Sequence, residues 1–233
     1  MSSADLHVGW CSHRAAAYAA THWHYTRQLP GGKRAQLGAW EGGRFVGAVV
    51  FSVSAAPMIA RPFGMQPEEV CELARVALDD HDTPVSRILA IACRLLHREM
   101  PGLRIVVSFA DTAQGHEGGI YKAAGWTYLG AKSYHAYVIH GETVHPRTLG
   151  SRYGRGGQSI TWLRANVDPK ARRIVTAVKH KYALGLDDEA RQLLAGMAKP
   201  YRSRVSGASS TTASRAVDAG ASPSLALQSA KAP

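Results

Sequence analysis

The chain has 233 residues, 45% of them hydrophobic, which is enough apolar material for one well-packed domain and too little for two full ones. Lysine and arginine number 28 against 17 acidic residues, and the resulting net charge of +11 favours a polyanionic partner such as DNA, RNA, an acidic membrane or the phosphates of a coenzyme. Three widely spaced cysteines exclude a disulfide framework and a thiolate zinc site.

The N-terminus and the hydropathy pattern bear on location. Residues 1–10 lack the basic start and apolar core of a signal peptide. No uninterrupted apolar run approaches the length of a bilayer span. We therefore expect a cytoplasmic protein without a membrane partner.

The first elements are a helix and a hairpin. An alanine-rich segment with Ser12 as a plausible N-cap predicts a helix over residues 12–25. Two β-rich runs follow, 35–40 and 44–53, separated by Glu41-Gly42-Gly43. This spacing and glycine content are typical of an antiparallel β-hairpin.

The middle of the chain alternates strands and helices. Residues 55–69 are rich in proline and predict an irregular excursion, and 70–78 predict a strand. Residues 85–99 place their apolar side chains on one helical stripe, with the arginines away from it. The continuous apolar run at 103–109 is typical of a strand in the middle of a sheet.

The later elements are shorter. Residues 118–124 predict a helix ended by Gly125, and 126–129 and 134–139 predict two strands. A basic segment of low regularity follows at 145–157. The predicted order of helix, three strands, helix, strand, helix and two strands indicates an α/β fold, with a mixed central sheet flanked by helices.

The last 32 residues have a different composition. From residue 202 onward serine, alanine, threonine and glycine dominate, and such a composition cannot offset the entropy of ordering. We expect residues 202–233 to form a disordered C-terminal tail.

Three stretches carry motifs. The central one runs through Ser108-Phe109-Ala110-Asp111, Gly115-His116, Gly118, Ile120-Tyr121, Ala123, Gly125-Trp126 and Tyr128-Leu129-Gly130. The others are Glu72–Val76 with Ser86-Arg87, and His24–Arg27 with Leu29–Lys33. With the element order, they resemble the phage Mom proteins, a branch of the GNAT-like acyltransferase fold. The resemblance extends more weakly to 179–182 and 199–201.

This resemblance implies an activity and a domain organisation. A GNAT-like catalytic core would span residues 1–144, and a basic extension at 145–201 would pack on it and contact DNA. The enzyme would use acetyl-CoA to modify the N6 amine of adenine, protecting phage DNA from host restriction in the host cytoplasm. The alternatives are a GNAT N-acetyltransferase for a protein or small-molecule amine, and a catalytically inactive DNA-binding protein.

Acyl transfer to an amine needs a polarised carbonyl, a base for the amine and an acid for the leaving thiolate. The resemblance assigns Tyr121 as the acid and Asp111 as the base or as an acceptor from the adenine amine. His24 is a further catalytic candidate on the substrate side. Without the resemblance, Tyr121 would be an ordinary core tyrosine and Asp111 a loop cap.

The cofactor would lie along the fourth strand of the core. The resemblance implies that backbone amides of Ala74, Arg75 and Val76 hold the thioester and pantetheine. Ser86 and Arg87 open a helix whose N-terminus favours a pyrophosphate. The loop before this helix lacks the glycines of many GNAT proteins, so it would cradle phosphate differently.

DNA contacts are predicted from the motifs and from the charge. The candidate residues are Ser108, His116, Tyr25, Arg27, Lys33, Arg152 and Arg155. An enzyme acting on adenine N6 must flip the base or bind single strands, and Trp126, Tyr128 and Tyr134 are open choices for stacking. Metal binding by His22 and His24 is a further alternative, which we rank below a role of His24 and Tyr25 on the substrate side.

Overall fold

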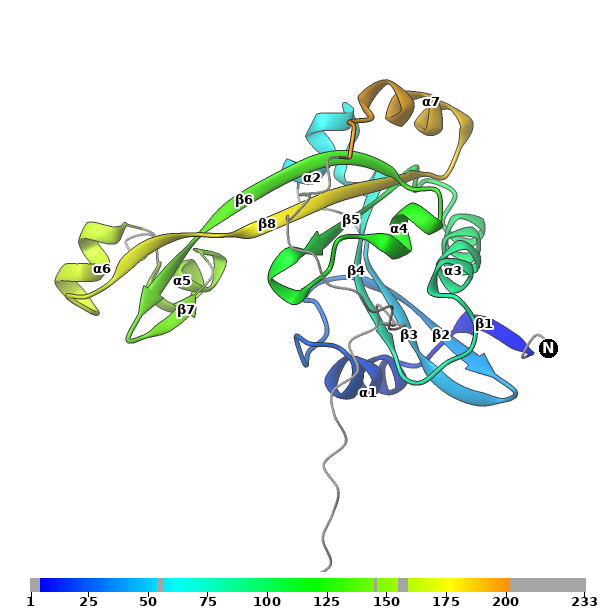
Figure 1. Ribbon diagram of the computed structural model, residues 1–233, viewed down its shortest axis with the longest axis horizontal. Coiled ribbons are helices and arrows are strands. Elements are labelled where there is room, and N and C mark those ends of the chain that lie inside the picture. Colours follow the sequence, from blue (N-terminus) through cyan, green and yellow to red (C-terminus); the bar gives the residue numbers. More distant parts are fainter. Residues whose placement is uncertain (1–4, 54–56, 145, 155–158, 202–233) are drawn as a thin grey trace, which may run out of the picture. The chain divides into compact units, whose positions relative to one another are not determined.

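The computed structural model describes residues 5–53, 57–144, 146–154 and 159–201 (Figure 1). The predicted tail at 202–233 lies outside this range, as does Arg155. The chain divides into two units. Unit 1 comprises the chain up to Ser108, residues 119–128 and the chain from Tyr182, and unit 2 comprises residues 109–118 and 129–181.

The described strands follow the sheet order β1-β2-β3-β4-β5-β8-β6-β7. Pairing is antiparallel from β1 to β4 and parallel between β4 and β5, so the predicted mixed sheet is confirmed. The strands are β1 (Leu6–Trp10), β2 (Arg34–Glu41), β3 (Arg44–Ser52), β4 (Val70–Leu78), β5 (Ile105–Asp111), β6 (Thr127–Ile139), β7 (Glu142–Val144) and β8 (Arg172–Gly185).

The helices fall in both units. Unit 1 holds α1 (His13–Trp23), α2 (Pro57–Ala60), η1 (Arg61–Phe63), η2 (Pro67–Glu69), α3 (Val85–Glu99), α4 (Gly119–Ala123) and α7 (Asp188–Met197). Unit 2 holds η3 (Thr112–Gln114), α5 (Pro146–Tyr153) and α6 (Ile160–Asn166). In the described part of the chain, none of the helices combines the length and apolarity of a membrane span.

Local sequence signals explain the first elements of unit 1. The Ser12 hydroxyl accepts a hydrogen bond from the Ala15 amide at 3.2 Å, confirming the predicted N-cap of α1. The β2–β3 turn places Gly42 and Gly43 at φ 55° and 80°, a conformation that favours glycine in a two-residue hairpin. The predicted hairpin, strand 70–78 and helix 85–99 are therefore all present.

The core of unit 1 lies on both faces of its sheet. Helix α1 packs Ala16 and Ala19 against Ala48 and Val50 of β3. These short side chains let helix and strand approach closely. Neighbouring strand residues such as Phe51 point to the opposite face and are also fully buried, so both faces are covered.

The later part of the chain differs from the prediction in three ways. The predicted strands at 126–129 and 134–139 are one continuous strand, β6, which passes through Gly130 at a φ of 104°. The prediction of low regularity at 145–157 is wrong, because Pro146–Tyr153 form α5. Strands β7 and β8 and helices α6 and α7 were not predicted. In the earlier part of the chain, β1 was not predicted either, and the predicted irregular excursion at 55–69 contains α2, η1 and η2.

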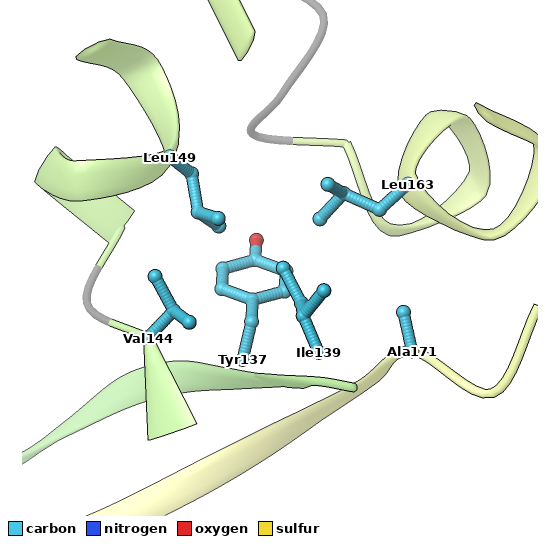
Figure 2. Packing of buried hydrophobic residues seen from close by; sticks show 6 residues of the cluster. All are labelled: Tyr137, Ile139, Val144, Leu149, Leu163 and Ala171. Atoms are coloured by element: carbon cyan, nitrogen blue, oxygen red, sulfur yellow. The ribbon is translucent and has the colours of Figure 1, made fainter. Parts of the chain in front are cut away.

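Unit 2 has a small hydrophobic core of its own, shown in Figure 2. The Tyr137 ring of β6 points between Leu149 of α5 and Leu163 of α6. Asp168, between α6 and β8, accepts hydrogen bonds from the backbone amides of His140 at 2.7 Å and Lys170 at 2.8 Å. It thereby ties its own loop to the turn between β6 and β7. These bonds lower the pKa of the Asp168 carboxyl and keep it charged.

An ion-pair network joins Arg104, the residue before β5, to the start of α7 within unit 1. Arg104 binds Asp187 through two hydrogen bonds of 2.7 and 3.1 Å, and Glu189 at 2.6 Å. Asp187 also caps α7, where its carboxylate accepts from the Ala190 amide at 2.7 Å. The Arg104 hydrogen bond holds the pKa of Asp187 at about 2, below its usual 3.8.

We predict that Asp187→Asn lowers the melting temperature at pH 7 by roughly 2–4 °C, because the asparagine keeps the cap but loses the charge. The folded pKa of Asp187 is depressed, so its stabilisation is complete above pH 3.8 and is lost as the pH falls towards 2. The difference from the wild type should therefore shrink in thermal melts below about pH 4. Asp188→Asn, at a side chain 89% exposed, is the control. An equal loss in both variants would contradict this role for the network.

Candidate active site

The parallel pairing of β4 with β5 changes character at Ser108. Backbone pairing joins Val70–Glu72 to Ile105–Val107. One residue farther along, the Ser108 hydroxyl replaces this backbone contact by donating a hydrogen bond to the Leu73 carbonyl at 3.0 Å. The same hydroxyl lies 2.8 Å from the Tyr121 hydroxyl. A side chain rather than the backbone thus links the strands here, and it connects them to α4.

Each of these two hydroxyl protons can be assigned to one acceptor. A carbonyl only accepts, so the Ser108 proton must point at Leu73 whenever that hydrogen bond is made. Tyr121 then donates to Ser108. Because the Ser108 proton can also reach the Tyr121 oxygen, it can turn to that oxygen if Tyr121 gives up its own proton. Both residues are buried, with exposed fractions of 1% and 7%.

Strand β4 carries a bulge one residue beyond this point. Leu73 lies opposite Phe51 and Arg75 opposite Val50, which leaves Ala74 as an extra residue. The Ala74 carbonyl accepts a hydrogen bond of 2.6 Å from the Arg75 guanidinium. The bulge therefore re-aims the backbone of the three predicted cofactor residues, Ala74, Arg75 and Val76.

The loop after α1 is tied to this bulge. Arg75 donates from Nε to the Gln28 carbonyl at 3.0 Å. Burial lowers the pKa of the Arg75 guanidinium, while nearby Tyr25 and Glu72 raise it. The structure thus brings the predicted N-terminal motif beside β4 within unit 1.

His24 and Tyr25 are arranged on this loop. The Thr26 amide donates to His24 Nδ1 at 3.2 Å, so that nitrogen is an acceptor and a neutral ring carries its proton on Nε2. The His24 and Tyr25 rings lie 4.4 Å apart, and Tyr25 is 49% exposed. The pair can present an aromatic surface to a ligand.

An aromatic cluster surrounds Tyr121. Its ring lies 5.1 Å from both Trp126 and Tyr182, and Tyr128 links Tyr182 to Tyr201 at 5.3 and 5.2 Å. Trp126 is buried, which leaves Tyr134 as the exposed member of the three stacking candidates. Our site prediction did not include Tyr182 and Tyr201, although the weaker motifs at 179–182 and 199–201 contain them.

The start of α3 offers backbone amides without a side-chain cap. Ser86 and Arg87 lie in its first turn, and Arg87 is exposed. In the preceding loop, the Glu41 carboxylate accepts from the amides of Asp82 at 2.9 Å and Thr83 at 2.8 Å. Burial raises the pKa of Glu41, but these hydrogen bonds bring it below its usual value. An anion at this loop would thus meet amides already bound to Glu41.

Asp111 and His116 belong to unit 2. The Asp111 carboxylate caps η3 by accepting from the Ala113 amide at 3.0 Å and pairs with Lys179 at 2.9 Å. The capping role weighed in the sequence is therefore present, and the ion pair is additional. The His116 amide donates to the Asp111 carbonyl at 3.2 Å, which closes the loop.

The remaining predicted DNA contacts lie in varied surroundings. Arg27 donates to the Thr21 and His22 carbonyls at 3.1 and 3.2 Å, so it caps the C-terminus of α1. Lys33 and Arg152 are exposed. Ser108, in contrast, is enclosed in the core of unit 1. Within the described residues, no group of three His, Cys, Asp or Glu side chains could hold a metal ion.

Comparisons with known proteins agree with the motifs. The Mom protein family matches residues 5–203. A protein of Escherichia phage Mu, named methylcarbamoylase Mom, is 29% identical over 177 residues, which cover 73% of this chain and 71% of the relative.

Among solved structures, yncA of Salmonella typhimurium, assigned as an acetyltransferase and determined with acetyl-CoA, has a TM-score of 0.45 at 11% identity and covers 78% of this chain and 95% of its own. The ribosomal-protein-S5-alanine acetyltransferase of Vibrio fischeri has a TM-score of 0.44 at 9% identity, over 81% and 97%.

We predict that Ser108→Ala lowers the free energy of unfolding by about 1–3 kcal/mol, because it leaves the buried Leu73 carbonyl without its donor. Urea titration measures this change. Ser86→Ala, in the uncapped first turn of α3, should stay within about 0.5 kcal/mol of the wild type. Equal stability of the Ser108 variant and the wild type would show that the hydroxyl does not join the two strands.

Proposed function

Because the chain belongs to the Mom protein family, we propose that it is a DNA-modifying transferase that uses acetyl-CoA to modify the N6 amine of adenine. Attack of the N6 nitrogen on the thioester carbonyl would release coenzyme A and convert the amine to an acetamido group; the methylcarbamoyl group named for the phage Mu relative contains a further nitrogen that this step does not supply. The modified base would protect phage DNA from host restriction. The observation that carries this proposal is the Ser108–Tyr121 hydroxyl pair, because it supplies a proton donor where the backbone pairing of β4 and β5 ends.

In this proposal Tyr121 protonates the thiolate of coenzyme A as it leaves. The resulting phenolate would be costly in a buried site unless a donor met it. Ser108 is that donor, since its hydroxyl can turn from the Leu73 carbonyl to the Tyr121 oxygen 2.8 Å away. Its burial favours this role of positioning and stabilising Tyr121 over the DNA contact predicted from the motif.

The cofactor would lie along β4 and the start of α3. Backbone amides at the bulge, at Ala74, Arg75 and Val76, would hold the thioester carbonyl and the pantetheine arm. The pyrophosphate would take the first-turn amides of α3 with the charge of Arg87, because Glu41 already occupies the amides of the preceding loop. When bound, acetyl-CoA supplies the activated two-carbon group.

The acceptor would be a DNA adenine removed from its stack. The exposed His24–Tyr25 ring pair offers a stacking surface beside β4, and His24 is a candidate to handle the amine proton. Asp111, held by Lys179, is a candidate acceptor for a hydrogen bond from the N6 amine. Arg27, Lys33, His116, Arg152 and Arg155 would contribute positive or polar contacts to the DNA backbone.

The primary test is expression of the full chain in bacteria. We expect plasmid DNA from these cells to resist restriction enzymes whose sites contain adenine, and nucleoside mass spectrometry to find a modified adenine. Ordinary adenine alone, from cells whose purified protein binds acetyl-CoA, would overturn the DNA assignment. An acetylated protein or small amine in its place would establish the alternative N-acetyltransferase.

For the mechanism, we predict that Tyr121→Phe lowers the yield of modified adenine by at least about 100-fold, the usual minimum for a lost general acid. Binding of acetyl-CoA, followed by calorimetry, should stay within about threefold of the wild type. Tyr18→Phe, at an exposed tyrosine of α1, is the matched control and should retain full activity. Full activity of a folded Tyr121→Phe protein would exclude Tyr121 as the acid.

A further inference from the structure

Unit 2 concentrates the positive charge of the chain. It contains ten lysines and arginines against four acidic residues, so it provides six of the eleven net charges. Of these carboxylates, Asp111 pairs with Lys179 and Asp168 accepts from backbone amides.

A two-stranded ribbon in unit 2 is positively charged. It consists of residues 129–139 of β6 and 172–181 of β8, which lie side by side (Figure 1). Neither segment contains an acidic residue. Exposed positions on the ribbon include Lys132, Arg172 and Arg173. Charge of one sign on a slender element is the pattern expected for binding a polyanion.

Two apolar side chains of the ribbon are unusually exposed. Val175 is 66% exposed and Tyr134 is 37% exposed. They lie at one level of the ribbon, because the neighbouring Thr176 hydroxyl donates to the Tyr134 carbonyl at 2.9 Å and accepts from its amide at 3.1 Å. Strand alternation places Val175 on the face of Arg173, and Tyr134 on the face of Lys132.

The dimensions of the ribbon fit duplex DNA. Eleven residues of β6 span roughly 35 Å at the usual rise per residue, close to one turn of the double helix. The major groove is about 12 Å wide and admits a two-stranded ribbon, whereas the minor groove, at about 6 Å, is too narrow. The major groove also exposes the N6 amine of adenine.

We propose that the β6–β8 ribbon of unit 2 docks in the major groove of duplex DNA, with Lys132, Arg172 and Arg173 on the phosphates and Tyr134 and Val175 against the base edges. This inference rests on the proposed function for the identity of the polyanion. It adds to that function the element that contacts the bases, the groove in which this element binds, and contact residues outside the catalytic motifs. It also explains why an apolar pair is exposed in the middle of a basic ribbon.

The charge contribution is tested by fluorescence anisotropy of the full chain with a 30-base-pair duplex at several salt concentrations. Lys132→Gln/Arg173→Gln should weaken binding at least tenfold and reduce the slope of log K against log salt by about two, one unit for each lost phosphate contact. Arg94→Gln/Arg98→Gln removes two exposed charges from α3 of unit 1 and should leave affinity and slope near the wild type. Equal effects of the two double variants would overturn the assignment to the ribbon.

The apolar pair and the groove need separate measurements. Tyr134→Ala/Val175→Ala should weaken duplex binding about five- to tenfold while leaving the salt slope unchanged, because no charge is lost. Methyl green, which occupies the major groove, should compete with the protein, and netropsin, which occupies the minor groove, should not. Competition by netropsin alone, or wild-type affinity in this variant, would contradict the docking geometry.

Light scattering tests whether the ribbon binds a second copy of the chain instead of DNA. A change of mass in the ribbon variants, with unchanged DNA affinity, would overturn the proposal. Failure of the ribbon and failure of the proposed function are also separable. Modified adenine made by a ribbon variant with wild-type affinity rejects the ribbon alone. Ribbon-dependent binding by a protein that leaves DNA unmodified supports the ribbon and rejects the proposed activity.

Discussion

The site depends on how β4 and β5 are joined. Parallel strands usually continue their backbone ladder, but here the ladder gives way to one serine hydroxyl that holds Leu73 and lies against Tyr121. The arrangement costs little, because every polar group in it has a partner. The backbone pairing of β4 with β5 ends one residue before the bulge residue's neighbour Leu73, and both hydroxyls are buried. The proposed acid lies against this hydroxyl, the bulge at Ala74 follows Leu73 in β4, and Arg75 ties the substrate loop to the bulge.

The two units have different physical characters. Unit 1 buries both faces of its sheet and holds the hydroxyl pair and the aromatic cluster, so it suits chemistry that needs a fixed and water-poor site. Unit 2 has a small core around Tyr137 and a strongly basic ribbon, so it suits binding of a long polyanion. In our account, the division of the chain corresponds to a division between reaction and recognition.

Much of unit 1 could be predicted from local signals. The Ser12 cap, the Gly-Gly hairpin and the apolar stripe of α3 act over a few residues, and each appears as expected. The start of α7 carries similar signals, since Asp187 is its cap and Asp188 and Glu189 lie in its first turn. That helix could have been found. Strand β8 could not be placed with confidence from its sequence, because its basic residues obscure the alternation and its partners β5 and β6 are distant in the chain.

The sequence predicted which residues belong to the candidate site better than it predicted what each of them does. The motifs identified Tyr121, Ser108 and the β4 residues, yet a serine in a motif looks the same whether it faces a ligand or the core. Burial and the Leu73 bond favour an internal role for Ser108. Tyr182 and Tyr201 were missed because they are distant in the sequence, and only folding brings Tyr182 beside Tyr121 and Tyr201 beside Tyr128.

The central claim is that a group derived from acetyl-CoA is transferred to adenine in DNA. The most direct measurement is tandem mass spectrometry of nucleosides from bacteria that express the chain during a short pulse of ¹³C-labelled acetate. The account predicts a modified adenine whose added group carries the label, read from the mass difference between modified and unmodified base. A modified adenine whose added group remains unlabelled, or the absence of any modified adenine, would contradict it.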